Sequence, residues 1–290
     1  MRYLDNAKFP SEDEELEKIF MPKGKMQLTY HDSMYPFRIF PQKGLTRLEF
    51  EPITILYGGN GSGKTTALNL IAQKLGAKRT SVLSKTFFYE EYLKLVEIEK
   101  TKDTYKSCEI VTSDDVFDYL LDIRHLNEGK ELKREALGQT YFEKKYELFQ
   151  LESLADYDEL KQRNEIKRKT KSKYIKSEVS KDTRLYSNGE SAYQYFTQRI
   201  TEDGIFILDE PENSLSPKLQ MKLVNFLEEA VRFYKCQIIM ATHSPFLLSL
   251  KEARVYDLDT YPVKARPWQE LENVRVYFDF LKKYEEGLDK

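Results

Sequence analysis

The 290-residue chain is poor in the residues that build disulfide frameworks and metal centres. It has two cysteines, Cys108 and Cys236, and three histidines. Two distant cysteines without neighbouring metal-ligating residues exclude a disulfide scaffold and a structural zinc site, which need several ligands at short spacings. We therefore expect a reducing compartment, the cytoplasm.

Long apolar runs are also missing from the sequence. No segment approaches the ~20 consecutive apolar residues that a membrane-spanning helix needs. The first 20 residues are acidic, whereas a secretion signal has an apolar core. The sequence therefore predicts neither secretion nor direct insertion into a membrane.

A strong overall charge is the third missing feature. The 46 basic and 48 acidic residues leave a net charge of −2, which excludes a protein that binds nucleic acid over its whole surface. One run departs from this balance, because Lys161–Lys176 holds eight basic residues and one acidic residue. The run is a candidate contact for the DNA or RNA backbone. The alternatives are a solvated helix or side chains that steady a bound nucleotide.

What the chain does contain is a glycine-rich loop between a predicted strand, Ile53–Tyr57, and a helical pattern that ends at Gly76. The loop matches G-x-x-x-x-G-K-[ST], in which backbone N–H groups cradle phosphates and the lysine reaches the β- and γ-oxygens. The threonine that follows ligates Mg²⁺. The predicted ATP-binding residues are Gly58, Gly59, Asn60, Gly61, Ser62, Gly63, Lys64, Thr65 and Thr66.

A second motif, IFILDEPE, is an apolar strand that ends in two carboxylates. Asp209 is the expected partner of Thr65 in holding the metal ion, and Glu210 is placed to polarise the attacking water. The predicted cofactors are therefore ATP and Mg²⁺. Lys64 and Glu210 are two of the three candidate catalytic residues.

Two further stretches, SNGE and ATHSP, follow the glycine-rich loop, and their order along the chain matters to the interpretation. The turn SNGE before the helical pattern SAYQYFTQRI presents backbone donors and a helix N-terminus together. The stretch ATHSP puts His243, the third catalytic candidate, after an apolar strand. Each stretch is ordinary when it stands alone.

Taken together, these motifs resemble those of the ATP-binding-cassette (ABC) ATPases. More narrowly, the stretches FFYEE, SNGES, LDEPENSLSP and ATHSPFLL resemble the small stand-alone ATPases of the AAA_21-like group. This group is related to the heads of structural-maintenance-of-chromosomes and RecF proteins. The resemblance implies an ATP-sandwiched homodimer, in which residues of one copy cap the ATP of the other: Ser187, Asn188, Gly189 and Glu190.

Some residues depart from that resemblance. The signature reads YSNGES rather than LSGGQ, and Pro217 stands where aspartate is frequent in the D-loop. No glutamine has an evident Q-loop context; Gln139 and Asp114 are candidate sensors of the helical lobe or else solvated residues. The aromatic stretch Tyr35–Phe37 could stack on adenine or pack in the core.

Alternating strands and helices predict an α/β fold of the P-loop NTPase, ABC type, with a mainly parallel sheet and an inserted helical lobe. We expect one domain over residues 1–290, with its core at 40–80 and 186–262. The lobe is expected at about 81–185 and a C-terminal helical tail at about 268–290. Ser113 and Ser216 are the expected N-caps of a lobe helix and of a helix over Pro217–Tyr234.

The function predicted from the sequence is an ATPase that acts as an ATP-dependent dimerisation switch. Its output would be on nucleic acid or an effector protein, in DNA repair or anti-phage defence by analogy. One alternative is the ATP-binding subunit of a membrane transporter, which the unusual signature disfavours. Another is a non-hydrolysing interaction module, which the presence of Lys64, Asp209 and Glu210 disfavours.

Overall fold

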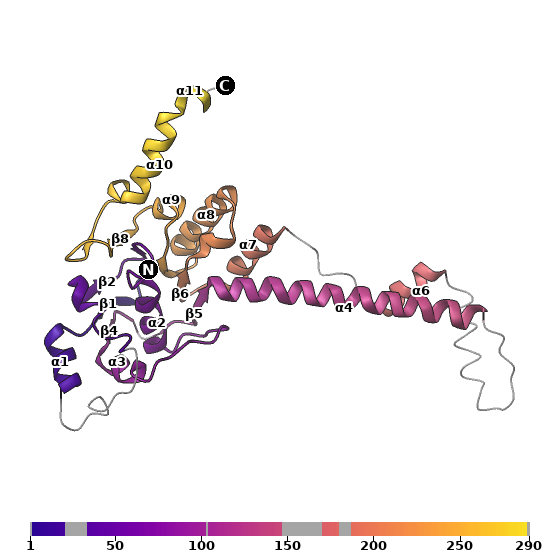
Figure 1. Ribbon diagram of the computed structural model, residues 1–290, viewed down its shortest axis with the longest axis horizontal. Coiled ribbons are helices and arrows are strands. Elements are labelled where there is room, and N and C mark those ends of the chain that lie inside the picture. The colour runs from indigo at the N-terminus through magenta and orange to yellow at the C-terminus, as the bar shows by residue number, and fades with distance from the viewer. Residues whose placement is uncertain (1, 21–33, 103, 147–169, 180–186, 289–290) are drawn as a thin grey trace. The chain divides into compact units, whose positions relative to one another are not determined.

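A computed structural model describes residues 2–20, 34–102, 104–146, 170–179 and 187–288 (Figure 1). It divides into two compact units, the first formed by residues 1–117 and 188–290 and the second by residues 118–187. The long helix α4 (Ser113–Tyr146) begins in the first unit and continues into the second. Among the described residues, none of the helices combines the length and the apolar character that a membrane span requires.

A six-stranded sheet forms the centre of the first unit, in the order β5-β6-β7-β3-β8-β9. Neighbouring strands are parallel, except that β9 runs antiparallel to β8. Every residue of β3, β6 and β7 is buried, as in a parallel sheet that is covered on both faces. The strands are β3 (Ile53–Tyr57), β5 (Ser107–Thr112), β6 (Gly204–Asp209), β7 (Gln237–Ala241), β8 (Arg254–Asp257) and β9 (Lys264–Ala265). The predicted α/β fold with a mainly parallel sheet is confirmed.

A second, three-stranded antiparallel sheet was not predicted. Its central strand, β1 (Leu4–Lys8), pairs with β2 (Arg47–Glu49) and with β4 (Glu97–Lys100). The sequence of β1 is LDNAK, and aspartate and asparagine are depleted in strands. Tertiary pairing therefore overrides the local preference at this position.

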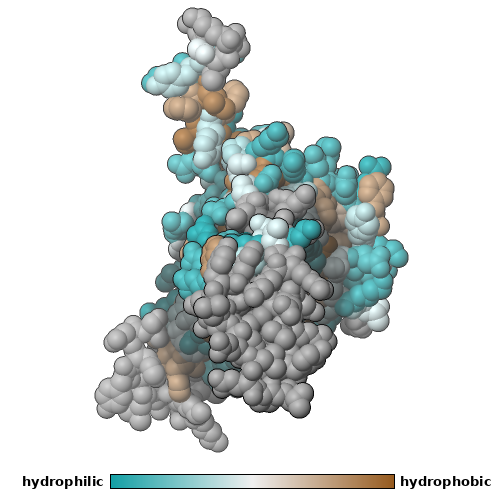
Figure 2. All heavy atoms as spheres, turned by 90° about the vertical axis from the view of Figure 1, so that its right-hand side faces the viewer, coloured by the Kyte–Doolittle hydropathy of each residue, from teal (hydrophilic) through white to brown (hydrophobic). Residues whose placement is uncertain are grey.

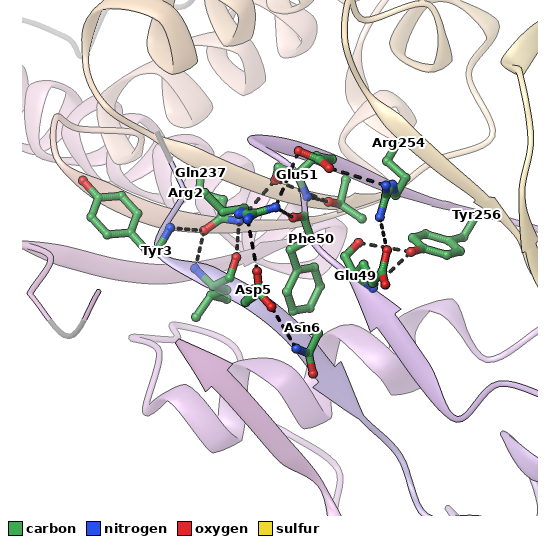
Figure 3. A network of polar contacts seen from close by, with 12 residues as sticks. Arg2, Tyr3, Asp5, Asn6, Glu49, Phe50, Glu51, Gln237, Arg254 and Tyr256 are labelled. Atoms are coloured by element: carbon green, nitrogen blue, oxygen red, sulfur yellow. Dashed lines mark hydrogen bonds and ion pairs between the residues drawn. The ribbon is translucent and has the colours of Figure 1, made fainter. Parts of the chain in front are cut away.

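The side-chain amide of Gln237 joins the two sheets (Figure 3). Its Oε1 accepts the backbone N–H groups of Tyr3 and Leu4, both at 2.8 Å, and its Nε2 donates to the carbonyls of Leu4 and Glu51, both at 3.1 Å. Gln237 is fully buried. A primary amide has two acceptor sites and two donor hydrogens, so this side chain uses its whole hydrogen-bonding capacity to hold β1 against the start of β7.

Helices cover the central sheet. α2 (Lys64–Leu75) packs on β6 and β7, and α8 (Pro217–Phe233) packs on β7. Gly76 ends α2 in the left-handed conformation at φ 65°, as predicted for a glycine C-cap. The remaining helices of the first unit are α1 (Glu12–Phe20), η2 (Pro41–Lys43), α3 (Tyr89–Leu95), α7 (Asn188–Arg199), η4 (Pro211–Ser214), α9 (Pro245–Leu248), η5 (Trp268–Glu270), α10 (Glu272–Lys283) and α11 (Glu285–Leu288).

The second unit is helical where the structure describes it. α6 (Lys171–Glu178) packs on the last turns of α4, where the rings of Tyr141 and Tyr174 lie 5.9 Å apart. The Lys171 Nζ lies 4.7 Å from the centre of the Phe142 ring. Tyr141 is only 3% exposed, so this helix pair has an apolar contact of its own.

The predicted boundaries of the lobe and the core are wrong. The lobe was expected from about residue 81, but α3, β4 and β5 belong to the first unit, which extends to Phe117. β5 pairs with β6 along its whole length, because its side chains complete the edge of the parallel sheet. The core also includes residues before 40, since β1 lies at the centre of the smaller sheet.

The cap of α4 lies one residue before its predicted position. The Thr112 Oγ1 accepts the N–H of Asp115 at 3.3 Å, and the Asp115 carboxylate accepts the N–H of Thr112 at 2.7 Å. This reciprocal pair is a capping box, so Thr112 replaces Ser113 as the N-cap. At α8, Ser216 and Pro217 occupy the predicted cap and first helical positions.

Replacing Gln237 with leucine should lower the free energy of unfolding by about 2–5 kcal/mol, because buried backbone groups would lose their partners. Urea denaturation would measure this change. The control Lys251→Gln removes an exposed ion pair with Glu228 and should change stability by less than about 1 kcal/mol. Equal effects of the two substitutions would contradict the role assigned to Gln237.

Candidate active site

The candidate site lies at the carboxyl ends of β3, β6 and β7, which are neighbours in the parallel sheet. The glycine-rich loop leaves β3, Asp209 ends β6, and His243 follows β7 by two residues. Parallel strands deliver their carboxyl ends to one edge of a sheet, where ligands of open α/β folds bind. Residues from three separate parts of the sequence therefore meet at this edge.

The loop needs glycine at two positions for steric reasons. A Cβ on Gly63 (φ 96°) would lie 2.9 Å from the Ile39 Cγ2, and a Cβ on Gly58 (φ 154°) would lie 2.7 Å from the Ser62 Oγ. The Ser62 hydroxyl is buried and has no hydrogen-bond partner in the described structure. A buried hydroxyl without a partner costs free energy, so the loop is suited to a polar ligand.

An open pocket of about 380 Å³ lies over the loop and is lined by residues 60–66, Tyr35, Ile39 and Glu210. The Tyr35 hydroxyl lies 3.0 Å from the Thr66 Oγ1. Phe37 is instead buried, with its ring edge-on to Tyr92. The two aromatic side chains of the stretch Tyr35–Phe37 thus have different positions, one in the pocket and one in the core.

Lys64 clamps the loop in this structure. Its Nζ donates to the carbonyls of Gly58 at 2.7 Å and Gly59 at 3.1 Å, and the residue is 4% exposed. Burial lowers the pKa of Lys64, while the carboxylates of Glu210 and Asp209 act in the opposite direction. A buried ammonium group near these carboxylates can donate hydrogen bonds to anionic oxygens that enter the pocket.

Thr65 and Asp209 lie together as predicted for a metal site. The Thr65 Oγ1 donates to the Asp209 Oδ1 at 3.2 Å. Asp209 is 8% exposed, and its burial raises the pKa of the carboxyl group to about 6, an effect that the Thr65 hydroxyl reduces and Glu210 increases. A nearby cation would compensate for this burial.

The donor set also suits one particular kind of ion. No group of three or more metal-ligating side chains occurs in the described ranges. One carboxylate and one hydroxyl are too few for a closed protein cage, but they fit Mg²⁺, which keeps waters and phosphate oxygens as ligands.

Glu210 has a strained backbone. Its φ of 48° is left-handed, which costs a non-glycine residue on the order of 1–3 kcal/mol and is typical of functional sites. Its side-chain Oε2 accepts the Asn213 amide at 3.0 Å, and Oε1 lies 3.4 Å from the His243 Nε2. The structure therefore brings two of the three predicted catalytic residues into direct contact.

Two residues that were not predicted fix the backbone of His243. The Glu212 Oε1 accepts the N–H of His243 at 2.6 Å, and the Asn273 Nδ2 donates to its carbonyl at 2.7 Å. The Asn273 N–H donates to the Tyr57 hydroxyl at 3.1 Å, and the Tyr57 and His243 rings lie 6.3 Å apart. Glu212 stands within the LDEPEN motif, so its position could have suggested a role. Asn273 is 30 residues beyond His243 and had no signal in the sequence.

Asp259 is a third residue that was not predicted. It follows β8, the strand on the other side of β3, and its Oδ2 accepts the N–H of Gly59 at 2.7 Å. This bond fixes the start of the glycine-rich loop. The available signal in the sequence was an acidic residue at the end of the stretch ARVYDLD, Ala253–Asp259.

The signature residues Ser187, Asn188 and Glu190 are exposed, and Gly189 is half-buried. The turn expected before the helix is instead its first turn, because α7 begins at Asn188. A Cβ on Gly189 would lie 2.9 Å from the Leu219 Cδ1 and 3.4 Å from the Ser214 carbonyl. Glycine thus lets α7 approach the segment that connects Glu210 to α8. Tyr186 lies outside the described residues.

The remaining candidates lie in or near the second unit. Gln139 is exposed on α4, and Asp114 is exposed in the first turn of that helix. Asp114 comes two residues after Thr112, which is level with Asp209 in the register of β5 and β6. Of the basic run, residues 161–169 lie outside the described residues, whereas Lys171 and Lys173 are exposed on α6.

Residues 73–249 match a protein family, AAA_21, described as "AAA domain, putative AbiEii toxin, Type IV TA system". The match covers 177 of the 290 residues, more than half of the chain, and starts after the glycine-rich loop. No curated protein matches the chain.

The solved structures that are similar to the chain include the following two. One is titled "An inward-facing conformation of a putative metal-chelate type ABC transporter"; it is 16% identical over 81% of this chain and 82% of that chain, with a TM-score of 0.37. The other is Stu0660 of Streptococcus thermophilus, which is 15% identical over 82% of this chain and 76% of that chain, with a TM-score of 0.39.

Replacing Asn273 with leucine should release the carbonyl of His243 and lower stability by about 1–2 kcal/mol. The imidazole resonances of His243 should shift in nucleotide-free protein, and those of the exposed His125 should stay in place. A chain with three histidines makes this NMR measurement simple. The control Asp279→Asn, on the exposed side of the same helix, should leave both sets of resonances unchanged. An unmoved His243 signal in the Asn273 variant would refute the anchoring role.

Proposed function

Because the chain belongs to the AAA_21 family of AAA-domain proteins, we propose that it binds Mg-ATP and hydrolyses it to ADP and phosphate. The observation that carries this proposal is the grouping of Thr65, Asp209, Glu210 and His243 at one edge of the sheet. The Thr65–Asp209 and Glu210–His243 atom pairs lie 3.2 and 3.4 Å apart, beside the glycine-rich loop.

In this proposal, the loop residues Gly58–Thr66 hold the phosphates through their backbone N–H groups. Lys64 would exchange its carbonyl partners for phosphate oxygens, which form stronger charge-assisted bonds. Thr65 and Asp209 would hold Mg²⁺. When bound, the ion would neutralise part of the negative charge on the phosphate oxygens. Tyr35 lines the same pocket and offers an aromatic face for the adenine base.

Glu210 would act as the general base. It accepts a proton from water as the water oxygen forms a bond to the γ-phosphorus and the bond from that phosphorus to the ADP oxygen breaks. His243 would orient the Glu210 carboxylate, because its Nε2 faces Oε1. Glu212 and Asn273 act one step further away by fixing the backbone of His243.

We further propose that ATP joins two copies of the chain and that hydrolysis releases them. The exposed Ser187, Asn188 and Glu190, with Gly189 between them, would cap the ATP of the other copy. α7 begins within this stretch, and a helix N-terminus favours anions. The segment from Glu210 to α8 packs against Gly189, so it offers a short connection between the catalytic base and the signature residues.

Replacing Glu210 with glutamine should lower the rate of phosphate release by about 10²–10⁴-fold, the usual range for loss of a general base. With Mg-ATP this variant should have the mass of two copies, and with Mg-ADP the mass of one, as measured by light scattering. The exposed Glu229→Gln control should keep its activity. One copy with ATP bound would refute the switch, and phosphate release at the unsubstituted rate would refute the role of Glu210.

The basic run Lys161–Lys176 supports an output on nucleic acid. Fluorescence anisotropy with labelled DNA and RNA should show binding without sequence preference. The affinity should fall steeply as the salt concentration rises from about 50 to about 200 mM, because contacts to the phosphate backbone are weakened by salt. Lys171→Glu combined with Lys173→Glu should weaken binding. Absence of binding at low salt would direct the search to an effector protein instead.

A further inference from the structure

Two features of the first unit have no part in the reaction proposed above. One is an apolar surface on α10, which Figure 2 shows as brown side chains near the top of the view. Tyr277, Phe278 and Phe280 are exposed there, and the described residues leave about half of each side chain uncovered. The other feature is the turn that follows β6, where the side chain of Asn213 contacts Glu210. Because this turn carries the proposed general base, the contact bears on the reaction.

The turn is the short 3₁₀ helix η4, in which Glu210 is the N-cap residue and Asn213 lies within the helix. Pro211 at the first position favours this turn, because the proline ring fixes φ near the helical value. The Asn213 N–H donates to the Glu210 carbonyl at 3.2 Å, which closes the turn. Side chains at positions i and i+3 lie over one another in a 3₁₀ helix. The local sequence therefore brings the Asn213 amide to the Glu210 carboxylate.

The bond between the two side chains has a defined direction. The Asn213 Nδ2 donates to the Glu210 Oε2 at 3.0 Å. An ionised carboxylate only accepts and an amide nitrogen only donates, so the chemistry decides which end of the amide faces Glu210. The His243 Nε2 lies 3.4 Å from the other oxygen, Oε1, but makes no hydrogen bond within the described residues. Of the two groups that face the carboxylate, Asn213 is therefore the closer one and the one that bonds to it.

The turn that carries Asn213 is itself held to the rest of the site. The Glu212 Oε1 accepts the N–H of His243 at 2.6 Å. At the end of the turn, the Gln220 Nε2 donates to the carbonyl of Leu215 at 2.8 Å, and its Oε1 accepts the Ser244 hydroxyl at 2.6 Å. These bonds tie the segment after β6 to the segment after β7. Asn213 thus stands on a supported turn, as a group that orients a catalytic side chain requires.

Glu210 needs a partner because packing alone does not fix its side chain. The side chain is 28% exposed, and a glutamate has several rotatable bonds whose freedom must be lost when it is held in one orientation. The residue lines the pocket over the glycine-rich loop. A general base must lie within hydrogen-bonding reach of the proton that it accepts. Without a donor for Oε2, the carboxylate would be free to rotate out of that position.

We propose that Asn213 is a positioning residue for ATP hydrolysis: it anchors the Glu210 Oε2 and thereby directs Oε1 at the attacking water. This inference rests on the proposed function, because it assigns a role within the same site. Oε1 accepts the proton of the water, while Oε2 keeps its bond to the Asn213 amide. The residues that line the pocket do not include Asn213. Its loss should therefore slow the reaction and leave nucleotide binding unchanged.

The test is phosphate release by the full chain with Mg-ATP. Asn213→Leu, which nearly keeps the size of the side chain and removes the donor, should lower kcat by about 10- to 100-fold, the usual cost of misplacing a catalytic group. KM and the affinity for Mg-ADP should not change, because the lost bond is not a contact to the nucleotide. Asn213→Gln keeps the amide and should restore much of the lost rate. The matched control Asn225→Leu, at an exposed position of α8, should keep the kcat of the unsubstituted chain.

A double variant separates a role through Glu210 from a general effect on the protein. If Asn213 acts by orienting Glu210, Asn213→Leu combined with Glu210→Gln should release phosphate as fast as Glu210→Gln alone, since the base is already lost. A further fall in the double variant would overturn the inference, and so would an unchanged kcat in Asn213→Leu. Both of these results leave the proposed function standing. Phosphate release by Glu210→Gln at the unsubstituted rate would instead overturn the inference together with the proposed role of Glu210.

Discussion

The parallel alignment of β6, β7 and β3 is the constraint on which the candidate site depends. In this register Asp209 is level with Ala241, and Ala241 is level with Leu56. The residues that follow each strand must therefore emerge side by side. Because all three strands are buried along their length, a shift of one strand would expose apolar side chains. Packing of the hydrophobic core thus sets the distances between the polar residues of the candidate site, which are not part of that core.

This arrangement collects negative charge at a buried edge. Asp209, Glu210 and Glu212 fall within four consecutive positions, and burial raises the pKa of both Asp209 and Glu212. The Lys64 charge compensates part of this negative charge, but its ammonium is itself buried and bonded to loop carbonyls. A site of this kind favours a cation beside Asp209 and an anion beside Lys64, because each relieves a charge that is poorly solvated. Mg-ATP supplies both.

Segments far from the motifs complete the site. Tyr35 approaches the start of α2 from before the loop, Asp259 holds Gly59 from beyond β8, and Asn273 holds His243 from the C-terminal helix. All three residues lie outside the stretch that matches the family. Asn273 also anchors the first turn of α10 at the candidate active site.

The sequence by itself was sufficient to predict the elements that depend on residues close together in the chain. The glycine-rich loop, the strand that ends in Asp209 and Glu210, and the helix that begins at Pro217 each depend on residue types at short spacings, and the structure has all of them. The parallel sheet followed from apolar strands that alternate with helices. The structure brings the side chains from these separate motifs together at one edge of the sheet.

Only the tertiary structure decided the rest. β1 has a sequence that disfavours a strand, and it forms one because the Gln237 amide and two neighbouring strands satisfy its backbone. The residues of β5 lie in a stretch of the sequence that is mostly polar, and they form a strand by pairing with β6. Asn273 and Asp259 reach the site across 30 and 200 residues of separation in sequence from the groups that they bind. Local patterns encode local hydrogen bonds and periodic burial, whereas such partners are chosen only when the packed core brings distant backbone groups within reach.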